Sequence, residues 1–85
     1  MKMAIKDEIE ARLRAAFAVT ALDVVNESHR HAGHTGDDGT GESHFAVLIR
    51  APEFGAMGRL ARHRAVQAAL GDVNTRVHAL ALDIG

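Results

Sequence analysis

The segment from Glu27 to Phe45 constrains the fold of this chain most strongly, because it is too long and too polar for an ordinary connection. It holds four of the six histidines, and four glycines lie between residues 33 and 41. Loops longer than about twelve residues are uncommon in compact domains and are usually functional or disordered. Glycine-rich polar sequence buries too little apolar surface to offset its conformational entropy. We therefore predict that residues 32–41 are poorly ordered without a metal.

Alternating apolar residues on both sides of this segment predict two strands. Leu22 and Val24 share one side of the stretch from Thr20 to Asn26, and the stretch from Ser43 to Ala51 alternates in the same way. Pro52 lacks a backbone N–H and ends the second stretch. We expect the two strands to pair in the antiparallel sense.

Two further stretches have the apolar spacing of helices. In the stretch from Met3 to Phe17, apolar residues recur at every fourth position from Ile5 onward, which predicts a helix of about fourteen residues. The stretch from Arg59 to Leu70 predicts a second helix, which Gly71 ends. The residues that fall on one side of this second helix are Leu60, His63, Val66, Gln67 and Leu70.

The remaining stretches complete a three-stranded fold. Glu53–Gly58 is a turn or a short helical piece, Asp72–Thr75 is a turn, and Arg76–Asp83 is the last strand. The predicted order is α-β-β-α-α-β, in which the segment before the second long helix supplies the other short helical piece. We predict an α+β fold with a three-stranded mixed sheet and the helices on one face, which leaves the other face to solvent or a partner.

Size and composition exclude several classes of protein. The 85 residues predict a single domain, 1–85, with one core. With no cysteine, the chain has no disulfide and no thiolate ligand, so any metal must be held by histidine or carboxylate. A formal charge of −1 gives no global basic field. The sequence shows no secretion signal, membrane span or catalytic spacing, so we expect a cytoplasmic protein that is not an enzyme.

The histidines are the candidate metal ligands. His78 comes as the chain enters the last strand, whereas His29, His31 and His34 come from the long loop. A metal site often combines a fixed ligand with an adaptable one, but two histidines do not complete a tetrahedral site. The alternative is a solvated loop and a His78 that only bonds locally. For the other two histidines, His44 beside Phe45 and His63 on the apolar side of its helix, we expect structural roles.

A weaker pattern points to nucleic acid. Gly55-Ala56-Met57-Gly58 is a GxxG turn before a helix that carries Arg59, Arg62 and Arg64. KH domains clamp a nucleic-acid backbone with such a turn. The middle residues are not basic here, so we favour the alternative, a solvated helix face with two glycines at a helix-helix turn. We expect the three arginines to lie mostly on the exposed side of the helix.

The chain resembles the BolA family over essentially its full length. The blocks that carry the resemblance are Ile5–Phe17, Glu27-Ser28-His29-Arg30-His31-Ala32-Gly33-His34, Glu42-Ser43-His44-Phe45, Phe54–Arg64 and Val77-His78-Ala79-Leu80. The family fold is α-β-β-α-α-β and is similar to the type II KH fold, which agrees with the order predicted above. The absence of cysteine places the chain with the members whose loop ligand is histidine.

The resemblance implies a non-catalytic partner of monothiol glutaredoxins in iron–sulfur cluster trafficking or iron-responsive regulation. The pair would share a two-iron, two-sulfur cluster with glutathione, and this chain would supply His78 and a loop histidine. For the loop ligand we favour His34 and His31, and we place His29 third. Imidazole in place of thiolate raises the potential of such a cluster, as in Rieske centres.

The family also includes proteins described as transcriptional regulators. That description implies the alternative function, a DNA-binding module that uses the basic region from Arg59 to Arg64. The chain lacks a charged residue after Phe54, where relatives often carry one. We expect no membrane partner, and a monomer or a weak homodimer.

Overall fold

A three-stranded mixed sheet organises the part of the chain that the structure describes. The computed structural model describes residues 4–27 and 44–85. Its elements in chain order are α1 (Ile5–Ala16), β1 (Ala21–Asn26), β2 (His44–Arg50), the 3-10 helix η2 (Pro52–Ala56), α2 (Arg59–Leu70), α3 (Val73–Arg76) and β3 (Ala79–Ile84). Within these ranges, no helix is long and apolar enough to cross a membrane.

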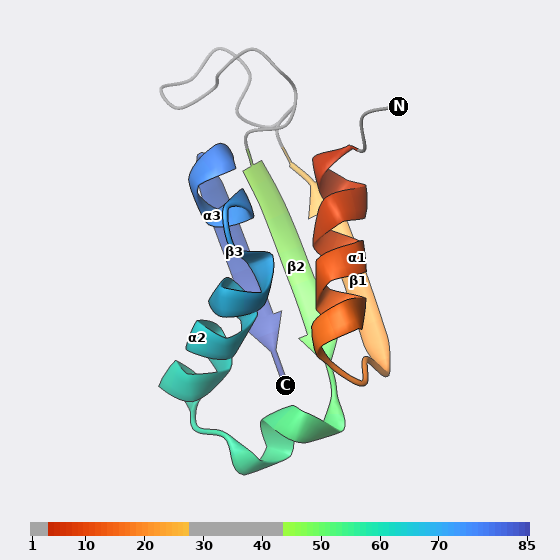
Figure 1. Ribbon diagram of the computed structural model, residues 1–85, viewed down its shortest axis with the longest axis vertical. Coiled ribbons are helices and arrows are strands. Elements are labelled where there is room, and N and C mark those ends of the chain that lie inside the picture. Colours follow the sequence, from red (N-terminus) through yellow and green to blue (C-terminus); the bar gives the residue numbers. More distant parts are fainter. Residues whose placement is uncertain (1–3, 28–43) are drawn as a thin grey trace.

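The strand pairing confirms the mixed sheet. β2 is the middle strand of the order β1-β2-β3 (Figure 1). β1 runs antiparallel to β2, with Val24 opposite Val47. β3 runs parallel to β2, with Phe45 opposite Leu80, and the crossover that a parallel pair requires passes through η2, α2 and α3. Because β2 and β3 are parallel, both strands begin at the same edge of the sheet.

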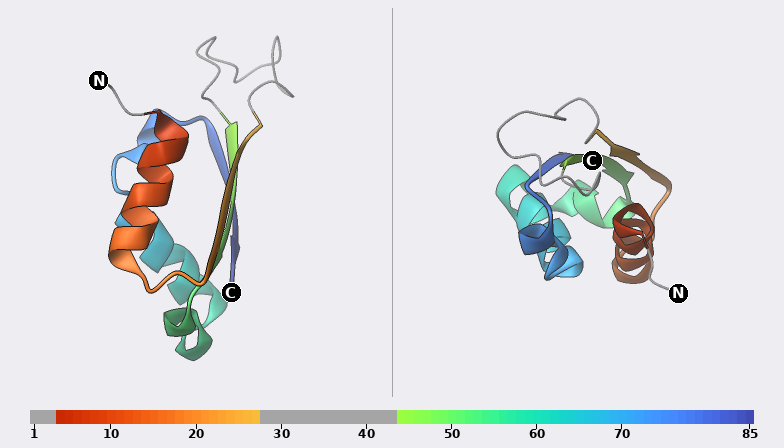
Figure 2. Two further views of the ribbon diagram at one scale, coloured as in Figure 1. Left: turned by 90° about the vertical axis from the view of Figure 1, so that its right-hand side faces the viewer. Right: turned by 90° about the horizontal axis from the view of Figure 1, so that it is seen from above.

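The two long helices cover one face of the sheet, as predicted (Figure 2). The four-residue spacing of α1 places Ile9 and Leu13 in the core, where both are fully buried, and α1 also contacts α2. Burying each such side chain stabilises the fold by about 1.5–3 kcal/mol. The remaining buried apolar residues are Ile5, Val24, Phe45, Val47, Ile49, Ala51, Phe54, Val66, Leu70, Val73 and Val77.

The opposite face of the sheet is not covered by any described helix (Figure 2). Residues that alternate with the core positions lie there, and Val25 is 42% exposed. Asp23, Leu48 and Ala81 line part of a shallow cavity of about 250 Å³ on this face. The prediction that the helices leave one face open is confirmed for the described residues.

The predicted packed side of α2 was wrong at Leu60 and at Gln67. Val66 and Leu70 are fully buried, but Leu60 is 63% exposed and Gln67 is also exposed. A helix turns by about 100° per residue, so Leu60 lies about 100° from the direction midway between Val66 and Leu70. The helix therefore buries a narrower stripe than the spacing of its apolar residues indicated.

The predicted turn from Asp72 to Thr75 is instead part of a one-turn helix, α3, and the last strand begins at Ala79 rather than Arg76. The N–H of Arg76 donates to the carbonyl of Asp72 at 3.2 Å, and Val73 is fully buried. Turns and single helical turns use similar backbone angles, so turn-forming residues do not separate them. The short helical piece predicted before α2 is confirmed as η2.

Candidate functional site

His78 lies immediately before β3, whereas the sequence placed it inside a last strand that began at Arg76. Val77, which caps the C-terminal end of α3, is 8% exposed and anchors the chain in the core. The next residue, His78, is exposed, and β3 begins at Ala79. The imidazole of His78 is therefore accessible to a partner, while the backbone on both sides of it belongs to ordered elements.

His44 lies beside His78. The ring centroids of the two histidines are 5.2 Å apart, and the ring planes are tilted by 51°. His44 is the first residue of β2 and pairs in register with Ala79, the residue after His78. Its side chain is buried, with 7% exposed, in contrast to the exposed His78. This contact was not predicted from the sequence, because it depends on the register between β2 and β3, which are far apart in the chain.

The long loop leaves and rejoins the sheet at the same edge. The N–H of Glu27, which follows β1, donates to the carbonyl of His44 at 2.8 Å. The three loop histidines singled out from the sequence, His29, His31 and His34, lie outside the described residues, as does the predicted disorder of residues 32–41. The described ends of the loop are therefore close to His78.

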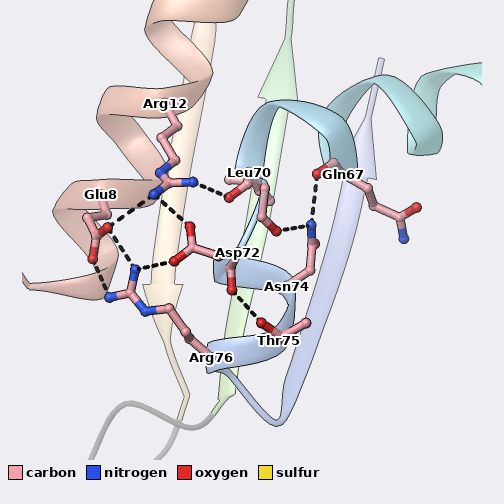
Figure 3. Close-up of polar contacts among 9 residues, drawn as sticks. Glu8, Arg12, Gln67, Leu70, Asp72, Asn74, Thr75 and Arg76 are labelled. Atoms are coloured by element: carbon pink, nitrogen blue, oxygen red, sulfur yellow. Dashed lines mark hydrogen bonds and ion pairs between the residues drawn. The ribbon is translucent and has the colours of Figure 1, made fainter.

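A network of charged side chains joins α3, which precedes His78, to α1 (Figure 3). Arg76 contacts Glu8 at 2.6 Å, and Arg12 contacts Asp72 at 2.8 Å. The hydrogen bond from Arg76 lowers the pKa of the Glu8 carboxyl, and the hydrogen bond from Arg12 lowers the pKa of the Asp72 carboxyl. The network fixes the start of the short connection that carries His78.

The junction of α2 and α3 is also fixed by side chains. Arg12 donates to the carbonyl of Leu70 at 2.6 Å, and the amide of Asn74 donates to the carbonyls of Gln67 and Gly71 at 2.8 Å each (Figure 3). These bonds satisfy carbonyls at the C-terminal end of α2. Gly71 has a φ of 56°, which favours glycine. The direction of α3 relative to α2 is thus set by several contacts.

The candidate nucleic-acid residues do not form a uniform set. Arg59 and Arg64 are exposed, but Arg62 is half-buried, and its Nε donates to the carbonyl of Phe54 at 2.8 Å. The prediction of mostly exposed arginines therefore holds for two of the three. His63 is half-buried rather than buried, and its Nδ1 lies 3.1 Å from the carbonyl of Arg59 in its own helix.

The described residues do not complete a metal site by themselves. Across residues 4–27 and 44–85, no group of three or more histidine, cysteine, aspartate or glutamate side chains could hold a metal ion. An accessible ligand such as His78 can contribute to a metal centre only if other groups supply the remaining ligands. Those groups would come from the loop or from a partner.

Comparison with known proteins identifies relatives along most of the chain. The family model described as "BolA-like protein" matches residues 13–84. A protein from Sinorhizobium sp, named for its place in the cobS 5' region, is 46% identical over 83 residues, which cover 95% of this chain and 89% of the relative. The DNA-binding transcriptional regulator BolA of Escherichia coli K12 is 43% identical over 81 residues, which cover 94% of this chain and 73% of the relative.

A solved structure has the same fold. BolA1 from Arabidopsis thaliana superposes with a TM-score of 0.79 at 27% identity, covering 98% of this chain and 92% of that chain. The arrangement of three helices and a mixed three-stranded sheet is therefore shared with a solved relative. The names of the Escherichia coli and Arabidopsis thaliana relatives are those of a transcriptional regulator and a BolA protein.

Proposed function

The chain belongs to the BolA family, and from this premise we propose that it is a non-catalytic partner of a monothiol glutaredoxin. The two proteins would jointly hold a two-iron, two-sulfur cluster, for cluster trafficking or iron-responsive regulation. The observation that carries the proposal is the exposed His78, which lies immediately before β3 at the edge of the sheet where the long loop is attached.

The donor set of the chain suits a shared cluster. The chain has six histidines and no cysteine, so it can offer imidazole nitrogens but no thiolate. The glutaredoxin cysteine and the glutathione thiol would supply the sulfur ligands of one iron, and this chain would supply the nitrogen ligands of the other. When bound, the cluster would supply one-electron chemistry at a potential raised by imidazole ligation.

Within this proposal, the residues of the chain have distinct roles. His78 is the ligand next to β3, and His34 or His31 is the ligand from the loop. Both ends of the loop lie at the edge that holds His78, because Glu27 bonds to His44 there. A loop ligand therefore starts close to the fixed ligand and does not need to cross the sheet.

The test is reconstitution of the chain with a monothiol glutaredoxin, glutathione, iron and sulfide, followed by visible absorption and circular dichroism. The wild-type chain should give a cluster spectrum that differs from that of the glutaredoxin alone. His78→Ala should abolish or strongly alter this spectrum while the apo fold remains intact, because an exposed residue contributes little to the core. His63→Ala is the matched control, since His63 bonds within its own helix. An unchanged spectrum for His78→Ala would contradict the assignment.

A second function is supported by the name of the Escherichia coli relative, a DNA-binding transcriptional regulator. In this chain, Arg59 and Arg64 on α2 are exposed and could contact phosphates. The two functions use different surfaces, so one chain could perform both. We favour the glutaredoxin partnership because it also accounts for His78 and for the histidine-rich loop.

A further inference from the structure

We infer that His44 is a positioning residue, which holds the imidazole of His78 in one orientation so that it can act as a ligand. The inference rests on the proposed function and deepens it. It assigns a role to His44, which is neither one of the candidate loop ligands nor a proposed ligand of the cluster. Its starting point is the ring contact between His44 and His78, at 5.2 Å between centroids.

The burial of His44 is unusual for its residue type and its position. His44 is the only buried polar or charged residue within the described ranges, with 7% of its surface exposed. Its neighbour Phe45 already supplies the apolar side chain that the core needs at this level, since it is 2% exposed. Polar side chains are rarely buried unless they are hydrogen-bonded or paired. Filling of the core therefore does not explain the histidine.

The backbone of His44 is held firmly, whereas His78 lies just outside its strand. The carbonyl of His44 accepts the N–H of Glu27, and its Cα pairs in register with Ala79. His78 is in the bend between α3 and β3. The His44 ring therefore provides a fixed surface against which an otherwise free side chain can pack. Aromatic rings favour tilted contacts with centroids about 4.5–7 Å apart, as here.

A fixed imidazole is a better ligand than a freely rotating one. A ligand that is already oriented loses less conformational freedom when the metal binds. Replacing a residue that orients a metal-binding histidine through a hydrogen bond typically changes metal affinity by about 10–100-fold, and for a ring contact we expect the lower end of this range. Direct ligation by His44 is disfavoured because its ring is buried, whereas an iron held partly by another protein must be reached at the surface.

The experiment compares His44→Ala with His44→Phe. Alanine removes the ring, whereas phenylalanine keeps a ring of similar size and removes both nitrogens. His63→Ala serves as the control. The first measurement uses the chain alone and needs no cluster: NMR contacts between the rings and the order of the His78 ring. We expect a disordered His78 ring in His44→Ala, and an ordered ring in His44→Phe and in the control.

The second measurement uses the complex with glutaredoxin and glutathione. We expect His44→Ala to lose its cluster to a chelator about 10-fold faster than wild type, and His44→Phe to remain close to wild type. Equal losses in both variants would overturn the inference, because they would show that the nitrogens of His44, and not the packing of its ring, are required. No loss in either variant, or a His78 ring that stays ordered in His44→Ala, would overturn it as well.

The two measurements separate this inference from the proposed function. A wild-type chain that forms no cluster would contradict the proposed function, whereas the NMR measurement on the chain alone would still decide whether His44 orders His78. If His44→Ala does not fold, the comparison of wild type with His44→Phe decides. If the His78 ring is disordered in a folded His44→Phe variant, packing against the ring at position 44 is not what orders it, and the inference is overturned.

Discussion

A guanidinium nitrogen of Arg76 lies 2.6 Å from a carboxylate oxygen of Glu8, so an ion pair joins the end of α3 to the first turn of α1. The two residues are 68 positions apart in the chain. Glu8 also lies near the N-terminal end of a helix, where negative charge is favourable. His78 follows the end of α3 by two residues. The ion pair therefore stabilises the fold and also helps to hold the part of the chain that carries the candidate ligand.

The first prediction concerns the response of stability to acid. The folded-state pKa values of the Glu8 and Asp72 carboxyls lie below their ordinary values of 4.5 and 3.8. These carboxylates therefore add stability that is fully present above about pH 4.5 and is lost as the pH falls through their folded-state values. Glu8→Gln should lower the thermal unfolding midpoint at pH 7, and its difference from wild type should shrink toward pH 3.

The matched control for this prediction is Glu10→Gln. Glu10 pairs with Lys6 one turn away in the same helix, so its loss does not separate two elements. We expect a smaller change for this variant, because exposed pairs within one helix contribute little. A difference between Glu8→Gln and wild type that stays constant from pH 7 to pH 3 would contradict the role of the Glu8 charge.

The second prediction tests which leucines of α2 belong to the core. Leu70→Ala should lower the free energy of unfolding by about 2–5 kcal/mol, because Leu70 is fully buried and its removal leaves a cavity. Leu60→Ala should change it by less than about 0.5 kcal/mol, because Leu60 is 63% exposed. Urea denaturation of both variants measures these values. Equal losses would mean that the first turn of α2 packs as the sequence pattern indicated.

Local patterns predicted most of the fold, because they report which face of each element is buried. Val24 and Val47 are buried and paired, as the alternation in their strands predicted. Leu13 is buried, as the spacing in its helix predicted. The same reasoning failed at Leu60, because the spacing of apolar residues does not say how much of a helix touches the sheet.

The contact between His44 and His78 could not be predicted from local patterns. It depends on the register of two parallel strands that are joined by a long crossover, so no tight turn fixes that register as it would in a hairpin. For a similar reason, the sequence did not show that Arg62 bonds to the carbonyl of Phe54, since the contact requires the placement of η2 against α2. The sequence likewise placed His78 inside the last strand, because it started that strand at Arg76 rather than at Ala79.

The third prediction separates DNA binding from stability. If the chain is a regulator, the double variant Arg59→Ala/Arg64→Ala should bind duplex DNA more weakly at low salt, and the slope of log affinity against log salt should fall by about 2. Its stability should be unchanged, because both side chains are exposed. Arg62→Ala should instead lower the free energy of unfolding by about 0.5–1.5 kcal/mol, through the lost bond to the carbonyl of Phe54. If the wild-type chain shows no measurable affinity for DNA at low salt, the regulator hypothesis is excluded.

The fourth prediction concerns the loop ligand of the proposed cluster. The candidates are His34 and His31, with His29 third because it lies closest to the end of β1 and has the shortest reach. Single alanine substitutions at the three positions should be compared by the spectrum of the complex with glutaredoxin. We expect His34→Ala to alter the spectrum most, His31→Ala less, and His29→Ala least.

Neighbouring loop histidines can replace one another, so the single variants alone do not decide the matter. The double variant His31→Ala/His34→Ala removes both favoured candidates and should lose the histidine-type spectrum even if each single variant keeps it. Lowering the pH through the histidine range, about 6.5 for an unperturbed side chain, should also loosen the site, because protons compete with the metal for the ligand nitrogen. If the double variant retains the wild-type spectrum, neither His31 nor His34 is a ligand. The nitrogen ligand beside His78 would then have to come from another residue.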